Sequence, residues 1–294
     1  LKNPKLVSFN PLACHLINLN YSECETSDFV DFINGSKILE GSTPFAMAYA
    51  GHQFGYFVPQ LGDGRAINLG AVNNWHLQTK GSGLTRYSRS GDGRAVLRSS
   101  IREYLMSEAM FGLGISTTRA LGIIDSDSFA HRDWEQESCS IVLRMSPSWI
   151  RVGTFEFFAR SRDKETISQL ADYVIKQSYP HLENEENKYE KMFYSLVDKT
   201  AELLAKWQVY GFQHGVMNTD NFSVAGLTLD YGPYAFMDYF EKNSICNHTD
   251  QEGKYSYNNQ PYVARWNLFA LIDALKLICD ESKLESYMKA FLPQ

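Results

Sequence analysis

Short apolar runs separated by glycine occupy the earlier part of the chain, and helical patterns follow them. Between residues 49 and 94 glycine recurs every few positions, and the stretches 66–69 and 75–80 have strand character. Closely spaced turns between short strands predict a small, mostly antiparallel sheet. From 96 to 113 the apolar residues recur at helical spacing instead, and Gly112 and Gly114 mark the end of the predicted helix.

The later part of the chain is dominated by amphipathic patterns with the period of a helix. One more strand is expected at 140–144, and helices are expected at 167–177, 189–210 and about 266–278. Gly211 directly follows the second of these helices and is a plausible stop signal. A sheet followed by helices predicts an α+β fold with two lobes.

The predicted organisation has three parts. Residues 1–48 mix Pro, Asn and Ser with short apolar pieces, so we expect an N-terminal wrapping segment with little regular structure. Residues 49–150 form the predicted sheet-rich N-lobe, and residues 151–294 form the predicted, mainly helical C-lobe. A cleft between two lobes is where a ligand is expected to bind.

The composition excludes several classes of protein. With 294 residues, 44% of them hydrophobic, the chain can bury a large core in one or two domains. A net charge of -6 argues against non-specific nucleic-acid binding. No apolar run approaches the roughly 18 residues of a membrane span, and no secretory signal is visible. The missing initiator Met leads us to expect a fragment or a processed product.

The five cysteines are scattered along the chain without C-x-x-C pairing. We therefore expect neither a structural zinc site nor a disulfide framework, and we expect a reducing compartment. Cys246 could have a redox role, although most free cysteines act only as small hydrophobes. His52 and His248 lack the spacing of metal ligands. The aromatic residues at 231–240 and 255–262 are expected to pack in the core and loops.

Lys80 and Glu103 form the first candidate constellation. Lys80 closes a predicted strand, and Glu103 lies in the predicted helix that follows. Protein kinases hold a strand lysine with a helix glutamate and so present its ammonium group to the phosphates of ATP. The alternative is that both residues are ordinary solvated surface charges.

A second constellation lies in the polar stretch 214–221 and the later Asp230-Tyr231-Gly232. His214 and Asn221 keep the spacing of a kinase catalytic loop, and Asp230 stands where the metal-binding Asp of that motif would be. The usual base position holds Val216, which cannot accept a proton, but Asp220 beside Asn221 could serve as the base. Asn and Asp oxygens suit Mg²⁺. The alternative is an Asx-rich turn.

Glycine and arginine provide the remaining candidates for phosphate contacts. The motif Gly-Asp-Gly-Arg occurs at 62–65 and again at 91–94, and backbone N–H groups of such short loops can approach phosphate. Neither copy is a Walker A motif, and each could be a plain turn. Arg144 and Arg151 could clamp phosphate in a bidentate manner, or could simply be surface residues that aid solubility.

Eight longer motifs are spread over almost the whole chain. They are YAGHQFG at 49–55, PQLGDGRA at 59–66, KGSG at 80–83, RSGDGR at 89–94, SIREY at 100–104, IRVGTFE at 150–156, HGVMNTDN at 214–221 and CNHTD at 246–250. In these motifs the chain resembles the selenoprotein O family. The resemblance implies a protein-kinase-like fold, once classed as a pseudokinase, that transfers AMP from ATP to Ser, Thr or Tyr hydroxyls of proteins.

The resemblance also implies roles for single residues. Asp220 would be the general base, and Asn221 and Asp230 would hold Mg²⁺ or Mn²⁺. Lys80 would contact phosphate and pair with Glu103. The other residues expected to line the ATP site, together with Asp230, are Gly62, Gly64, Arg65, Asp92, Gly93, Arg144 and Arg151.

The family implies a flipped ATP, so that the pyrophosphate leaves towards Arg144 and Arg151, which would neutralise its charge. The expected partners are protein substrates, with no nucleic acid and no membrane. The expected location is the cytoplasm in a bacterium or the mitochondrion in a eukaryote. Family members are longer, so we expect this chain to be truncated at its C-terminus. The alternatives are a conventional kinase and a catalytically inactive nucleotide-binding fragment.

Overall fold

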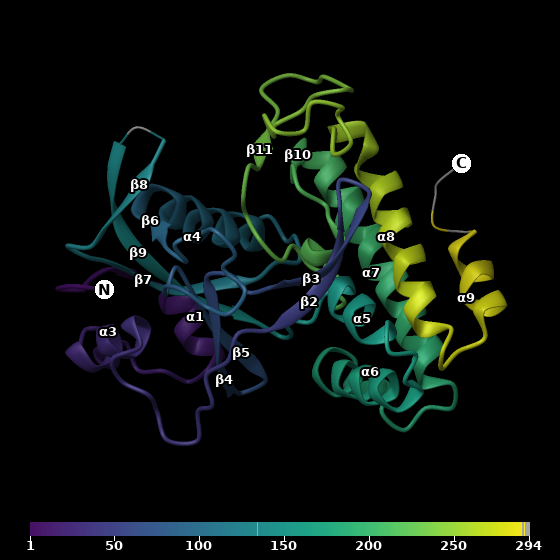
Figure 1. Cartoon of the computed structure of the whole chain (residues 1–294), viewed down its shortest axis with the longest axis horizontal. Coiled ribbons are helices and arrows are strands. Elements are labelled where there is room, and N and C mark those ends of the chain that lie inside the picture. The colour runs from purple at the N-terminus through teal and green to yellow at the C-terminus, as the bar shows by residue number, and fades with distance from the viewer. Residues whose placement is uncertain (134, 290, 292–294) are drawn as a thin grey trace. The chain divides into compact units, whose positions relative to one another are not determined.

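The computed structural model describes residues 1–133, 135–289 and 291 (Figure 1). The chain divides into two compact units. The first comprises Leu1–Ala48 and Leu61–Pro147, and the second comprises Tyr49–Gln60 and Ser148–Gln294. Segment 1–48 therefore belongs to the sheet-rich unit, and the short segment 49–60 belongs to the helical unit.

The N-terminal segment contains regular structure, so the expectation of little regular structure there was wrong. Its elements are β1 (Lys5–Phe9), α1 (Pro11–Leu16), α2 (Tyr21–Cys24) and α3 (Ser27–Asn34). The polar residues that suggested loops are helix caps instead: the side chains of Asn10, Asn20 and Thr26 accept backbone N–H groups at the starts of the three helices.

An antiparallel sheet forms the centre of the first unit, as the sequence predicted. Its strands run in the order β1-β7-β9-β5-β4, and β6 and β8 also pair with β9. The strands after β1 are β4 (Ala66–Val72), β5 (Trp75–Lys80), β6 (Ala95–Val96), β7 (Arg119–Asp125), β8 (Phe129–Arg132) and β9 (Glu135–Ser146). The strands expected at 66–69, 75–80 and 140–144 are all confirmed.

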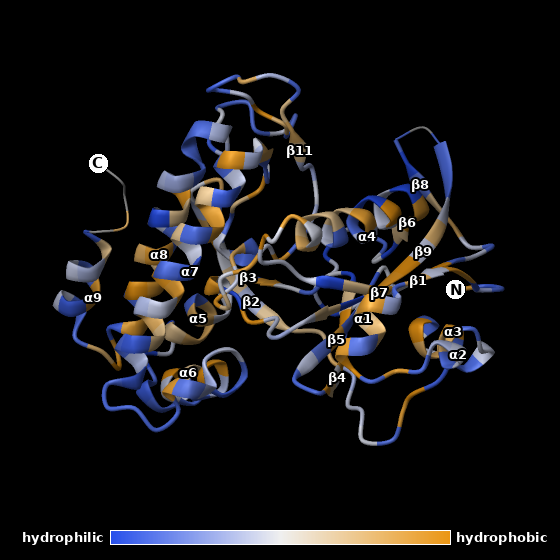
Figure 2. Cartoon of the chain, turned by 180° about the vertical axis from the view of Figure 1, so that it is seen from behind, coloured by the Kyte–Doolittle hydropathy of each residue, from blue (hydrophilic) through white to orange (hydrophobic). Residues whose placement is uncertain are grey.

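Alternate side chains of β9 lie on two different faces of the sheet, one apolar and one polar, because successive residues of a strand point to opposite faces. Ile141, Leu143 and Met145 are fully buried in the core cluster that also contains residues of α1–α3. The intervening Ser140 and Arg144 bond to residues of α4 (Leu97–Gly112), at Ser100 and Glu103. Figure 2 shows the change from hydrophilic colour at the start of β9 to hydrophobic colour further along it.

Two cysteines of the first unit lie side by side, which the scattered spacing did not predict. The Sγ atoms of Cys14 in α1 and Cys24 in α2 are 3.5 Å apart, and both side chains are completely buried. Burial raises the pKa of both thiols, that of Cys24 to about 12. Both cysteines are free thiols, and they serve as small core residues here.

The second unit consists mainly of helices. They are α5 (Val152–Ala159), α6 (Lys164–Ser178), α7 (Lys188–Tyr210), α8 (Gln260–Leu275) and α9 (Glu281–Met288). The helices expected at 167–177, 189–210 and 266–278 correspond to α6, α7 and α8. Gly211 ends α7 in the left-handed conformation at φ 66°, as expected for a helix stop. Short strands β10 (Phe212–Gln213) and β11 (Ala235–Phe236) pair after it.

A hairpin from early in the sequence completes the second unit. It is formed by β2 (Ala48–Gln53) and β3 (Tyr56–Gly62). The backbone N–H of His52 donates to Thr219 Oγ1 at 2.7 Å. The backbone N–H of Phe54 donates to Asn218 Oδ1 at 3.2 Å and to the Tyr255 hydroxyl at 3.0 Å. These bonds fix the hairpin to the polar loop just before Asp220 and to Tyr255. In the described part of the chain, no helix is long and apolar enough to cross a membrane.

Candidate functional site

In the first unit, Lys80 and Glu103 form a buried ion pair. Lys80 ends β5 and Glu103 lies in α4, and their Nζ and Oε2 atoms are 2.6 Å apart. Only 6% of Lys80 and 4% of Glu103 is exposed, so the alternative of two solvated surface charges was wrong. The strand and the helix hold the ammonium group in one place, as the kinase-like hypothesis requires.

Arg144 shares Glu103 with Lys80. Its NH1 atom lies 2.7 Å from Glu103 Oε1, and its NH2 atom donates to Gln78 Oε1. Arg144 is only 5% exposed, so it is not a surface residue for solubility. Gln78 in turn donates to Asn68 Oδ1 at 3.2 Å, which extends the buried polar network across β5 and β4. Glu103 therefore balances two cations inside the unit.

Both glycine motifs meet the loop between β5 and α4. Gly83 N–H donates to the Gly93 carbonyl at 3.0 Å. A Cβ on Gly93, at φ +69°, would lie 2.1 Å from the Gly83 carbonyl oxygen. A Cβ on Gly62 would lie 2.3 Å from the Tyr87 ring, and one on Gly64 would lie 3.0 Å from the Tyr87 carbonyl. A side chain is excluded at Gly62 and Gly93, and at Gly64 it would fit only if the Tyr87 backbone moved slightly.

Two charged residues of the glycine motifs lie at the surface. Asp92 accepts a bidentate pair of hydrogen bonds from Arg132, at 2.7 and 2.9 Å, and this contact holds the pKa of its carboxyl below the ordinary value. Arg65 is exposed. Both side chains, which are expected to line the ATP site, are thus exposed to solvent, whereas Lys80 is buried.

In the second unit, α8 holds the loop that starts at His214. Gln260 accepts from the His214 backbone N–H at 2.9 Å and donates to Phe212 O at 2.9 Å. Asn267 donates to Met217 O at 2.9 Å. The His214 ring hydrogen-bonds to the backbone of Asp230, and burial lowers its pKa to about 4. His214 is therefore neutral, and it joins the loop to Asp230.

Asp220 is the most unusual charged residue of this loop. It is 7% exposed, and burial raises the pKa of its carboxyl. Gln53 Nε2 donates to Oδ2 at 3.2 Å, whereas Oδ1 is buried without a hydrogen-bond partner among the described residues. An unpaired buried carboxylate oxygen is costly, and its lone pairs are not occupied by any donor among the described residues.

Two glycines make room for this carboxylate. A Cβ on Gly51, in β2, would lie 2.6 Å from Asp220 Oδ1. A Cβ on Gly153, in α5, would lie 2.2 Å from the Ala50 carbonyl and 3.2 Å from Asp220 Cα. The hairpin, α5 and the loop can therefore approach one another at Asp220 only because both positions lack a side chain.

Arg151 supports the backbone beside the carboxylate rather than lying at the surface. It is 6% exposed, its NH1 donates to the Asp220 carbonyl at 2.9 Å, and its guanidinium lies 4.4 Å from the Tyr49 ring centre. The solubility interpretation was therefore wrong for Arg151 as well. Arg144 and Arg151 belong to different units, and their joint action on phosphate stays a prediction.

Of the two predicted metal ligands, Asn221 ends the polar loop and Asp230 follows nine residues later. Asn221 follows Asp220 in a short 3-10 turn, and both Asn221 and Asp230 are half-buried. Among the described residues there is no group of three or more His, Cys, Asp or Glu side chains that could hold a metal ion. Mg²⁺ often takes only one or two protein ligands and completes its shell with phosphate and water, so this donor set fits it.

Gln53 and Gln78 are site residues that the sequence patterns did not predict. Gln53 lies in one of the motifs quoted above, but its contact with Asp220 spans 167 residues. Gln78 could have been found, because it lies two positions before Lys80 and so shares its face of β5. Cys246 is half-buried and its thiol donates to Gln213 O at 3.6 Å, beside Gly215.

Comparison with known proteins confirms the resemblance drawn from the motifs. The model of the family described as "Protein adenylyltransferase SelO" matches residues 2–294. A protein nucleotidyltransferase YdiU of Myxococcus xanthus is 49% identical in an alignment that covers 98% of this chain and 60% of that protein. Proteins of the same name from Thioalkalivibrio sulfidiphilus and Pseudomonas fluorescens are 49% and 48% identical, over 95% and 100% of this chain. The chain spans about three fifths of the length of these relatives.

Proposed function

Because the chain belongs to the protein adenylyltransferase SelO family, with its kinase-like fold, we propose that it transfers AMP from ATP to hydroxyl groups of protein substrates. The observation that carries the proposal is the state of Asp220. A general base needs a raised pKa and a lone pair that no other donor occupies, and Asp220 has a raised pKa and an Oδ1 without a hydrogen-bond partner among the described residues. Val216, at the usual base position of a kinase, has neither.

In the proposed reaction, the oxygen of an acceptor Ser, Thr or Tyr hydroxyl attacks the α-phosphorus of ATP. Asp220 takes the hydroxyl proton, the bond between the α-phosphorus and the bridging oxygen breaks, and pyrophosphate leaves. Lys80 would contact phosphate, and Glu103 would hold Lys80 in position. The glycines at 62, 64 and 93 would let backbone N–H groups approach the nucleotide.

The remaining nucleotide contacts of the proposal come from charged residues. They would be Arg65, Asp92, Arg144, Arg151 and Asp230. Arginine suits this role because its planar guanidinium can bind phosphate oxygens in pairs. Arg144 and Arg151 would favour the transition state if they neutralise the charge that develops on the leaving pyrophosphate.

We propose that Asn221 and Asp230 bind Mg²⁺ or Mn²⁺. Their oxygens are hard ligands, and the adjacent Asp220 Oδ1 is a buried oxygen without a partner among the described residues. When bound, the ion would supply positive charge for the phosphate groups. The chain's own residues orient these ligands: His214 holds the backbone of Asp230. We also propose that the protein is located in the cytoplasm if it is bacterial, or in the mitochondrion if it is eukaryotic.

Mass spectrometry of the intact protein, after incubation with ATP, Mg²⁺ or Mn²⁺ and an acceptor protein, tests the proposal. We expect a mass gain of one AMP on the acceptor or on the chain itself. In a parallel assay, label should be transferred from the α-position of ATP. Label transferred only from the γ-position would instead show a conventional kinase.

A catalytically inactive nucleotide-binding module would bind ATP without any transfer. A thermal shift with ATP in both the wild type and Asp220→Ala, and no modified product from either, would be the signature of such a module. That result would overturn the proposed function.

A further inference from the structure

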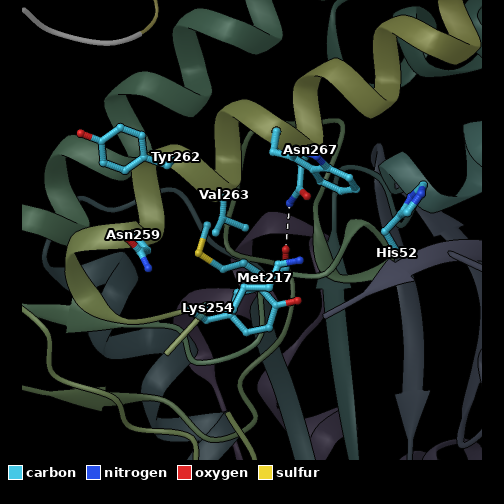
Figure 3. Close-up of a pocket in the computed structure, with 9 residues that line it drawn as sticks. His52, Met217, Lys254, Asn259, Tyr262, Val263 and Asn267 are labelled. Atoms are coloured by element: carbon cyan, nitrogen blue, oxygen red, sulfur yellow. Dashed lines mark hydrogen bonds between the residues drawn. The ribbon is translucent and has the colours of Figure 1, made fainter. Parts of the chain in front are cut away.

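A pocket of about 290 Å³ lies within the second unit, beside the loop that carries Asp220 (Figure 3). Figure 3 shows Val263 and Asn267 of α8 beside Met217. The lining residues that the inference uses come from β2, the polar loop, a later loop and α8; they are His52, Met217, Lys254, Tyr255, Tyr262 and Trp266.

Two aromatic side chains of this pocket are unusually exposed for their size. Tyr262 is 58% exposed and Trp266 is 42% exposed, and they are four positions apart in α8, so they share one face of the helix. The His52 ring lies 4.8 Å from the Trp266 ring, and its Nδ1 is 2.5 Å from Glu156 Oε1. The aromatic wall is thus held in place but not covered.

A cation lies next to this wall. Lys254 Nζ is 5.6 Å from the centre of the Trp266 ring, and burial lowers the pKa of the Lys254 ammonium group. No carboxylate among the described residues forms an ion pair with it. The nearby Asp250 carboxylate accepts backbone N–H groups of Lys254 and Tyr255 instead, at 2.9 and 2.7 Å. The Asp250 and Glu252 carboxylates act on Lys254 only at longer range. The pocket therefore combines an open aromatic wall with an ammonium group that makes no direct ion pair among the described residues.

The pocket shares its wall with the proposed catalytic loop. Met217 is three positions before Asp220, and the Tyr255 hydroxyl donates to Asn218 Oδ1 in the same loop. His52 is the neighbour of Gln53, which donates to the Asp220 carboxylate. An extended polypeptide advances about 3.3 Å per residue, so residues a few positions from a hydroxyl held at Asp220 can reach this pocket.

We propose that the pocket binds the acceptor polypeptide next to the modified hydroxyl. It takes an aromatic or large aliphatic side chain against Trp266, with a neighbouring carboxylate on Lys254. We infer this ligand from complementarity: an apolar side chain suits the aromatic wall, and a carboxylate suits the Lys254 ammonium group. This inference rests on the proposed function, because only an acceptor of AMP must lie at Asp220.

Short synthetic peptides test this selectivity. Each carries one central Ser, Thr or Tyr, and a Phe-Glu or Phe-Lys pair is moved through the flanking positions in an otherwise Gly-Ala sequence. Binding is measured by fluorescence polarisation of labelled peptide, and AMP transfer is measured separately. At one position we expect the Phe-Glu peptide to bind about tenfold more tightly than the Phe-Lys peptide, as one charge-assisted contact allows.

Two variants sharpen the test. Lys254→Glu should reverse the preference towards Phe-Lys, and Trp266→Ala should weaken binding of both peptides, while the KM for ATP stays unchanged. The matched controls are Lys176→Glu, an exposed lysine in α6, and Tyr239→Ala, a 74% exposed tyrosine. Both controls should keep the wild-type preference.

The outcomes separate the two proposals. Equal affinity for Phe-Glu and Phe-Lys at every position would overturn the pocket assignment even if AMP is transferred. Selective binding without any transfer would uphold the pocket as a peptide site and overturn the proposed function. Dimerisation that depends on Trp266, without peptide preference, would assign the pocket to a second copy of the chain and overturn the inference.

Discussion

Each unit buries one carboxylate that its proposed chemistry uses, but their surroundings differ. Glu103 in the first unit has a cation on each oxygen, Lys80 on one and Arg144 on the other. Asp220 in the second unit has only the Gln53 amide on one oxygen and nothing among the described residues on the other. The paired carboxylate holds other side chains in position, whereas the unpaired one keeps a lone pair for chemistry.

The sharpest way to test this comparison is Asp220→Asn. General base catalysis contributes about 10²- to 10⁴-fold, so AMP transfer should fall by that factor. Burial raises the pKa of this carboxyl, so its ionised form costs folding free energy at neutral pH, and the uncharged amide should raise the Tm at pH 7. Transfer assays and thermal melts of one preparation measure both effects. Asp238→Asn, at an exposed aspartate, should change neither.

Glu103→Gln tests the paired carboxylate. The amide removes the negative charge that Lys80 and Arg144 share, which should lower the free energy of unfolding by about 3–5 kcal/mol. Urea denaturation measures this loss. Glu137→Gln is the control, because its partner Arg98 is 63% exposed and such pairs contribute about 0–1 kcal/mol. An equal loss in the two variants would contradict the contrast drawn here.

Burial shifts the pKa of His214 in the opposite direction from that of Asp220 in the same loop: it lowers the pKa of the imidazole and raises that of the carboxyl. Its pKa is about 4 in the folded protein, against an ordinary value of 6.5 that the unfolded chain regains. The unfolded state therefore takes up the proton first, so the stability from neutral His214 is complete above about pH 6.5 and is lost as the pH falls to about 4. The loss should reach about 3 kcal/mol.

Urea denaturation of His214→Asn at pH 7.5, 5.5 and 4.5 measures this effect. The variant should lose this part of the acid sensitivity, while His248→Asn, at an exposed histidine, should follow the wild type. An unchanged acid profile in His214→Asn would show that the buried ring is not the group that titrates.

The smallest expected effect comes from Gln53→Ala. Loss of the donor to Oδ2 should raise the pKa of Asp220 further, so the acid limb of the pH profile of kcat should move to higher pH. Activity at neutral pH should fall by up to about tenfold. A purely structural role would lower the Tm without moving the pH profile, and Gln251→Ala, at an exposed glutamine, is the control.

The sequence predicted site residues correctly where both partners lie on strands or helices with a clear hydrophobic period. Lys80 ends a strand and Glu103 lies in the next long helix, so strand and helix periods together bring out this pair. The caps Asn10, Asn20 and Thr26 were missed because the same residue types favour loops, and only the following backbone decides between the two. Gln53 was missed because no local pattern reports a partner 167 residues away.

The hairpin formed by β2 and β3 has a consequence for biosynthesis. His52 leaves the ribosome 167 residues before its partner Thr219, a delay of about ten to thirty seconds at 5–20 residues per second. A two-stranded hairpin is only marginally stable alone. The β2–β3 hairpin therefore has no partner to pack against until the helices of the second unit have been synthesised. Asp220 can therefore acquire its amide partner Gln53 only after this early segment docks onto the completed second unit. A chaperone that shields the segment until then would raise the yield of correctly folded protein.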